Sequence, residues 1–181
     1  THLSKFDKRD AISDNYIFDV FKDVNGSVWI ATFTGLNRFE NNLAKFITKS
    51  IYENGSLLSI NYFLEMNDGN VLIGTESGIK VFNTNDESIR DFKTFFKSKE
   101  NYFESLYIYS FYLDTDSCLW VGTRDSGLYI YDIKSDKVID VSEELDIKKL
   151  NHAVVREMVC DEFGNFWVAT NVGLCCINLK D

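Results

Sequence analysis

Proline, histidine, cysteine and net positive charge are all scarce or missing in this sequence. Its 181 residues include no proline, two histidines, four cysteines, and 19 basic against 28 acidic side chains. The net charge of −9 argues against a nucleic-acid phosphate backbone, or an anionic membrane surface, as the main partner. No apolar run approaches the roughly 20 residues that cross a bilayer, so we expect no membrane insertion by this segment. With 45% hydrophobic residues, the chain is too apolar for intrinsic disorder.

The cysteines form no recognisable disulfide or metal framework. Cys118, Cys160, Cys175 and Cys176 are separated by 42, 15 and 1 residues, which does not fit the paired C-x-x-C units of a zinc site. We expect them to be small buried hydrophobic residues within strands, with Cys175 and Cys176 on opposite faces. The sequence therefore predicts no metal and no other cofactor.

Catalytic motifs are also missing. The histidines are His2, near the start of the sequence, and His152, in an expected loop, and neither belongs to a recognisable motif. There is no nucleophile elbow, no zinc-protease motif and no phosphate-binding glycine loop. The carboxylates are spread over turns, which is typical of solvation rather than acid–base chemistry. We therefore expect no catalytic residues in this segment.

What the sequence does contain is a fourfold internal repeat. WIATFTGL at residues 29–36 returns as LIGTESGI at 72–79, as WVGTRDSGL at 120–128 and as WVATNVGL at 167–174. The shared threonines are spaced by 43, 48 and 47 residues. We expect the tryptophans to pack between neighbouring sheets, the threonines to bond backbone groups, and the glycines to adopt the positive φ of a tight hairpin. These structural motif residues are Trp29, Thr32, Gly35, Thr75, Gly78, Trp120, Thr123, Gly127, Trp167, Thr170 and Gly173.

Each copy of the repeat predicts one blade of a β-propeller. Three β-branched and aromatic runs, separated by Gly, Asn, Asp and Ser turns, precede a weaker fourth run such as IRDFKTF. Four antiparallel strands at this pitch are typical of a propeller blade. We expect an all-β chain of about four blades, with units at about 15–58, 59–104, 105–150 and 151–181, and a short helix near 143–150 capped by Asp140 or Ser142.

The ends of the repeat leave the ring open to two interpretations. Residues 2–8 are expected to form the fourth strand of an adjoining blade, and the last unit stops after its third strand. If these pair, the ring closes with four blades. Otherwise the chain is a fragment of a larger propeller, and we expect self-association or further blades to cover the exposed apolar faces.

A second pattern, D-x-x-G-x-x-W, ends at the motif tryptophan and is intact in two of the four copies. It reads Asp23/Gly26/Trp29 and Asp161/Gly164/Trp167, and is altered to Asp114/Ser117/Trp120 and Met66/Gly69/Leu72. A calcium loop would need more oxygen ligands than these short turns offer. We interpret the Asp as an acceptor for the backbone amides of its own turn.

Candidate ligand-binding residues lie in the links between blades and in one enlarged turn. The links at about 47–59, 94–106 and 139–152 should share a face with the tight hairpins. The aromatic residues of the middle link would suit stacking on sugar rings or gripping a protein partner, and Arg124 and Asp125 could add polar contacts. The alternative is that the aromatics fold back over the blade rim. The candidate residues are Phe96, Tyr102, Phe103, Arg124 and Asp125. Tyr107 and Tyr109 follow directly after the middle link.

The consensus D-x-x-G-x-x-W-[IV]-[AG]-T-x-x-G-L, preceded by segments such as AISDNYIFDVFKD, resembles the two-component regulator propeller repeat. The first and last copies fit best, whereas the second lacks the turn Asp and the Trp. Such repeats build the extracytoplasmic sensor region of bacterial hybrid two-component histidine kinases, notably in gut Bacteroides. The resemblance implies a periplasmic or extracellular sensor for oligosaccharides, with no catalytic residues to carry over.

Two classes of function therefore remain open. One is a non-catalytic sensor module that passes ligand binding to a kinase elsewhere in a longer protein. The other is a propeller lyase or hydrolase that resembles streptogramin lyase, for which His152 is the best candidate base. A plain scaffold for protein partners is a weaker third interpretation.

Overall fold

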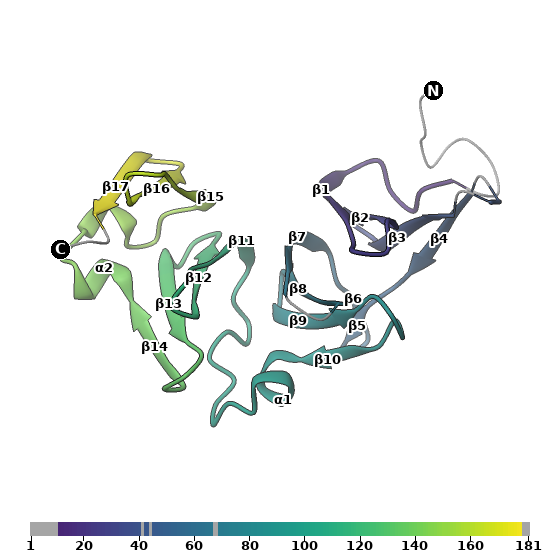
Figure 1. The fold of residues 1–181 in the computed structure, drawn as a ribbon, viewed down its shortest axis with the longest axis horizontal. Coiled ribbons are helices and arrows are strands. Elements are labelled where there is room, and N and C mark those ends of the chain that lie inside the picture. The colour runs from purple at the N-terminus through teal and green to yellow at the C-terminus, as the bar shows by residue number, and fades with distance from the viewer. Residues whose placement is uncertain (1–10, 41, 44, 67–68, 179–181) are drawn as a thin grey trace. The chain divides into compact units, whose positions relative to one another are not determined.

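A computed structural model describes residues 11–40, 42–43, 45–66 and 69–178, and the regular secondary structure of these residues is mostly β-strand (Figure 1). The chain divides into two compact units, residues 1–90 (unit 1) and 91–181 (unit 2). The predicted propeller architecture of four-stranded antiparallel sheets is confirmed. Residues 2–8, expected to form a further strand, lie outside the described residues. Among the described residues, no helix has the length and apolarity that a membrane crossing requires.

Unit 1 contains two four-stranded sheets and a small hairpin between them in sequence. The first sheet has the order β1(Ile17–Lys22), β2(Val28–Thr32), β3(Gly35–Glu40), β4(Lys45–Lys49). The hairpin is β5(Tyr52–Glu53) and β6(Ser56–Leu57). The second sheet consists of β7(Ile60–Glu65), β8(Asn70–Thr75), β9(Gly78–Asn83) and β10(Ile89–Asp91).

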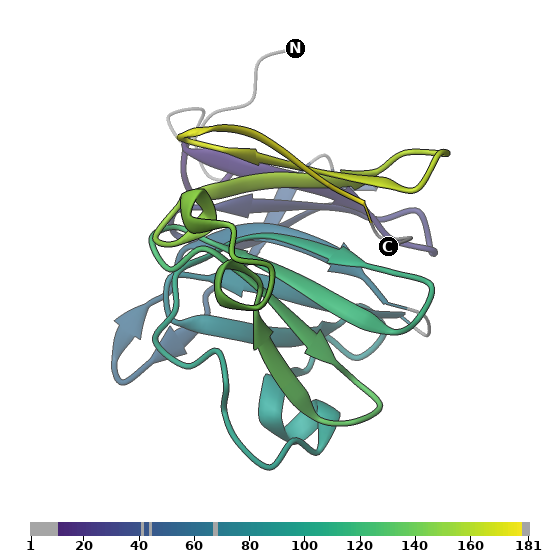
Figure 2. The same cartoon turned by 90° about the vertical axis from the view of Figure 1, so that its left-hand side faces the viewer.

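Unit 2 repeats this plan with short helices in the links. After α1(Phe92–Phe96) comes a sheet of β11(Ile108–Leu113), β12(Cys118–Thr123), β13(Leu128–Asp132) and β14(Lys137–Asp140). The link then forms α2(Val141–Glu144) and a 3₁₀ helix, η3(Lys148–Leu150). The last sheet has three strands within the described residues, β15(Val155–Cys160), β16(Asn165–Thr170) and β17(Gly173–Asn178), seen together in yellow-green in Figure 2.

Two local expectations were wrong. The run IRDFKTF was predicted to be a strand, but β10 ends at Asp91 and α1 follows. Phe92 and Phe96 lie one helical turn apart with ring centroids separated by 4.7 Å, so the helix buries Phe92 with support from Phe96. The four cysteines lie in strands as expected, yet three are only half-buried and Cys176 is exposed.

In each unit, a motif tryptophan packs between the two sheets. Trp29 is 3% exposed and contacts Phe82 of β9, with ring centroids 4.8 Å apart. Trp120 is 4% exposed and contacts Phe166 of β16, with centroids 4.3 Å apart. Trp167 lies on the last sheet and is only half-buried. The tryptophans of β2 and β12 therefore belong to the apolar cores that join the sheets within each unit.

The hairpin after each motif strand is closed by the threonine and the glycine of the repeat. The Thr hydroxyl donates to the carbonyl of the motif Gly in all four copies, over 2.7–2.9 Å. Gly127 has φ +77°, and a Cβ there would lie 2.4 Å from the Leu150 carbonyl oxygen. Glycine is thus required there both by the backbone conformation and by the close approach of the following link.

The Asp of the D-x-x-G turn has a double role, only half of which was predicted. Asp23 Oδ1 accepts from the backbone amides of Asn25 (2.9 Å) and Ser27 (2.8 Å), as expected. In addition, Asp23 Oδ2 accepts from Trp29 Nε1 at 2.8 Å. The Asp114–Trp120 and Asp161–Trp167 pairs form the same bond, at 3.1 Å and 2.9 Å. The spacing D-x₅-W therefore ties each turn to the tryptophan that follows it.

Candidate functional site

The links and tight hairpins of unit 2 meet at one end of its sheets. Arg124 N donates to the Tyr107 carbonyl (2.9 Å), and Gly127 N donates to the Ala153 carbonyl (3.3 Å). Asn171 N, in the hairpin of the last sheet, donates to the Val154 carbonyl (3.1 Å). We call this end, with the side chains of Tyr107, Tyr109, Arg124, Asp125, His152 and Arg156, the loop face.

An arginine and two tyrosines form a stacked group on the loop face. The Arg124 guanidinium lies 5.0 Å from the centre of the Tyr107 ring, which in turn lies 5.2 Å from the Tyr109 ring at an interplanar angle of 89°. Arg124 is exposed and has no acidic side chain within ion-pair distance among the described residues. The group therefore offers aromatic surface beside a guanidinium whose donors are available to a ligand.

Two β-bulges on neighbouring strands shape the same end. The register of β11 shifts between Ile108 and Ser110, and that of β15 shifts between Val155 and Glu157. The extra residues are Tyr109 and Arg156, and the Ser110 hydroxyl joins the two strands by donating to the Val155 carbonyl (3.1 Å). Bulges redirect side chains and are frequent beside binding sites. Sequence reasoning missed Arg156, although the same register shift recurs after the first residue of β1 and of β7 and therefore follows the repeat.

His152 lies on the loop face without a catalytic arrangement around it. Its side chain is exposed, its backbone has φ +57°, and its Nδ1 lies 3.3 Å from the Asp125 carbonyl oxygen. No carboxylate orients the ring within the described residues. The contact fixes the enlarged turn against the following link rather than building a base–nucleophile pair.

The other candidate residues lie at the opposite end of β13. Phe96, Tyr102 and Phe103 surround Tyr131, with ring centroids 5.7, 6.0 and 6.2 Å away. Phe103 is 1% exposed, and the Tyr102 hydroxyl donates to the Asp136 carbonyl (3.1 Å). This cluster covers the sheet, as in the alternative that the aromatics fold back. Arg124 and Asp125 precede β13 whereas Tyr131 and Asp136 lie at and beyond its end, so the five residues predicted as one site form two groups.

The aromatic cluster is held by Asp136. Its carboxylate accepts from the Ser98 hydroxyl (2.7 Å), the Lys99 amide (2.9 Å) and the Tyr131 hydroxyl (3.1 Å). The Lys99 amide is the main cause of a lowered pKa at Asp136. Burial, assisted by Asp136, raises the pKa of Tyr131 to about 12. Both groups therefore keep their ordinary protonation states at neutral pH.

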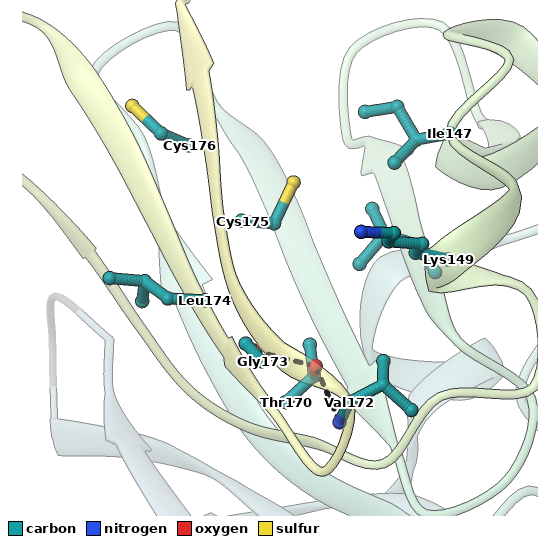
Figure 3. Close-up of a pocket in the computed structure, with 9 residues that line it drawn as sticks. Ile147, Lys149, Thr170, Val172, Gly173, Leu174, Cys175 and Cys176 are labelled. Atoms are coloured by element: carbon teal, nitrogen blue, oxygen red, sulfur yellow. Dashed lines mark hydrogen bonds between the residues drawn. The ribbon is translucent and has the colours of Figure 1, made fainter.

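A cavity of about 280 Å³ lies in unit 2 between the 147–150 link and β17. The Lys149 ammonium and the Cys175 thiol both point into it, from opposite walls, while Cys176 points away (Figure 3). Burial raises the pKa of the Cys175 thiol, so it is protonated at neutral pH. Among the residues that the structure describes, no three His, Cys, Asp or Glu side chains gather as metal ligands.

Comparisons with known proteins identify the repeat and the fold. The two component regulator propeller family matches residues 11–34 and 102–125. A search of curated proteins finds no match. Among solved structures, two of the extracellular domain of BT4673 from B. thetaiotaomicron are similar to this chain. One, described as a one component system, superposes with a TM-score of 0.73 at 24% identity. The other, described as a hybrid two component system, gives a TM-score of 0.70 at 23% identity.

Two other structures share the fold at lower identity. Virginiamycin B lyase from Staphylococcus aureus superposes with a TM-score of 0.61 at 13% identity, over 93% of this chain and 54% of the lyase. The designed protein Ika4 gives a TM-score of 0.55 at 10% identity, over 98% of both chains. The match to BT4673 covers 93% of this chain and 22% of that domain, so this chain spans about a fifth of its length. The chain therefore has the fold of a β-propeller segment, and two stretches of it match the two component regulator propeller model.

Proposed function

We propose that this chain is part of the extracytoplasmic sensor region of a hybrid two-component system and that it binds oligosaccharides without catalysing their conversion. The proposal is supported by the repeat, by the likeness to extracellular domains of two component systems, and by the stacked Tyr107, Tyr109 and Arg124 group. That group is the observation that carries it. Sugar rings pack their C–H faces on aromatic rings, and guanidinium donors bond hydroxyl or acidic oxygens.

The absence of a prepared acid–base pair on the described loop face favours binding over catalysis. His152, the candidate base of the lyase alternative, touches a backbone carbonyl and has no carboxylate to orient it. Likeness to virginiamycin B lyase supports only the shared fold. If the alternative were right, His152→Ala would abolish turnover of a substrate by the purified chain.

The test is calorimetric titration with a panel of neutral and acidic plant and host glycan oligosaccharides. We expect saturable binding to at least one class, weakened about 10-fold or more by Tyr107→Ala or Arg124→Ala. Phe163→Ala is the matched control because Phe163 is a 70% exposed aromatic side chain in the turn that follows β15, at the end of that strand opposite its bulge. Absence of binding across the panel, or binding that survives both loop-face substitutions, would contradict the assigned site.

A further inference from the structure

The face of the β15–β17 sheet that carries Trp167 presents exposed apolar side chains. Val159 and Cys176 pair with Trp167 on its two sides and so share its face, and Leu174 lies two residues before Cys176. Val159 is 55% exposed and Leu174 is 67% exposed. We call this surface the Trp167 face.

The same positions are fully covered in the two other sheets that contain a motif tryptophan. Leu36 of β3 and Leu128 of β13 occupy the place of Leu174 in the repeat, and both are 0% exposed. Leu36 lies in the core that joins the sheets of unit 1, and Leu128 lies in the corresponding core of unit 2. Within each unit, the face of the first sheet that carries the motif tryptophan is therefore covered by the second sheet.

A polar contact accompanies this packing at the bulge of each first strand. Asp19 of β1 accepts a hydrogen bond at Oδ2 from the backbone amide of Phe63 in β7 (2.9 Å). Ser110, at the same position of β11, donates to the Val155 carbonyl of β15 (3.1 Å). Glu157 holds this position in β15, directly after the bulge. The Trp167 face thus carries both the apolar surface and the polar side chain of the contact.

The complementary surface is present on unit 1. The face of the β1–β4 sheet opposite Trp29 carries Val20 and Phe39, which stand where β7 and β9 place Phe63 and Phe82. Val20 is 59% exposed, and Phe39 is half-buried beside Phe46. We call this surface the Val20 face. The Trp167 face and the Val20 face therefore correspond to the two surfaces that pack on each other between the sheets of each unit.

We propose that two copies of this chain associate head to tail, with the Val20 face of one copy packed on the Trp167 face of the other. The contact is between unlike surfaces, so each copy keeps one face free for a further copy until a ring closes. In the complex, Leu174 is buried. Glu157 takes the position that Asp19 has beside Phe63, and it competes with Asp19 Oδ1, 2.8 Å away, for the Val20 amide. Oligosaccharide binding at the loop face is not required for this association.

Analytical ultracentrifugation of the whole 181-residue chain, under reducing conditions and over a wide concentration range, tests the proposal. We expect reversible association that is weakened about 30-fold or more by Leu174→Lys or by Val20→Lys. The matched controls are Val172→Lys and Val24→Lys, because these residues are 59% and 73% exposed in turns outside the two faces. Circular dichroism and thermal melting verify that each variant is folded.

Mixing the two face variants separates this interface from other kinds of self-association. Leu174→Lys protein keeps an intact Val20 face, and Val20→Lys protein keeps an intact Trp167 face. An equimolar mixture should therefore form a 1:1 dimer that does not grow, although each variant alone is monomeric. A wild-type chain that stays monomeric throughout, or a Val20→Lys variant that associates like the wild type, would overturn the proposal.

Discussion

In unit 1 the junction between the two sheets is filled by side chains, whereas the equivalent junction in unit 2 leaves open space. Phe82 of β9 packs on Trp29, but Ile177 holds the same place in β17 and lines a cavity of about 220 Å³ beside Trp120. Ile89 of β10 also packs against the core of unit 1. No described strand of unit 2 takes the place of β10 beside β17.

The second difference concerns the link that crosses the junction. In unit 1, Lys80 of β9 forms an ion pair with Glu53 of the β5–β6 hairpin. In unit 2, Cys175 stands in place of Lys80, and the helical link leaves the cavity of about 280 Å³ between Cys175 and Lys149. The repeat thus fixes the hairpins of every sheet, whereas residues outside the repeat decide whether the space between sheets is filled or stays open to a ligand.

The largest expected effect comes from removing the tryptophans that both junctions share. Trp29→Ala and Trp120→Ala should each cost about 3–5 kcal/mol, because each deletes a buried ring and removes the indole donor from Oδ2 of its Asp partner. Trp167→Ala should cost about 1 kcal/mol, because that ring is only half-buried while the chain is monomeric. Urea unfolding at low protein concentration measures all three. An equal cost at Trp167 would mean that its face is already covered in the monomer.

The sequence predicted the parts of this molecule that depend on short spacings. Strand order, the hairpins at Gly35 and Gly127 and the Asp-bonded turns all follow from residues within about ten positions of one another. The site was predicted less well. Arg124 and Asp125 lie on the loop face, but Phe103 is buried and Arg156 was not anticipated. Burial of an aromatic depends on partners far away in the chain, which composition does not reveal. The bulge lies within one hairpin and recurs in every copy of the repeat, but it becomes visible only when the register of the two strands is known.

A pair of exchanges tests whether one residue accounts for the space beside Trp120. Phe82→Ile should destabilise unit 1 by about 1–2 kcal/mol, since it removes ring contacts with Trp29. Ile177→Phe should stabilise unit 2 by up to about 1 kcal/mol by filling part of the 220 Å³ cavity. Native-state hydrogen exchange assigns each change to its unit. Destabilisation by Ile177→Phe would indicate overpacking against Phe166. In that case the cavity exists because no described strand of unit 2 lies beside β17 as β10 lies beside β9.

The smallest effect concerns what the units have in common, the bond between the turn Asp and its Trp. The Trp167 indole, followed by the Asn165 side chain, lowers the pKa of Asp161 to about 2. Because the folded-state pKa lies below the ordinary value of 3.8, this contribution to stability is complete above about pH 4 and is lost as the pH falls towards 2. Trp167→Phe removes the indole donor and should raise the pKa of Asp161 towards its ordinary value, which a carboxyl NMR titration measures directly.

Phe163→Ala is the matched control, because Phe163 is 70% exposed and contributes only its backbone amide, which the substitution keeps. If Trp167→Phe leaves the titration unchanged, the backbone amides rather than the indole hold the carboxylate, and the D-x₅-W spacing serves packing alone.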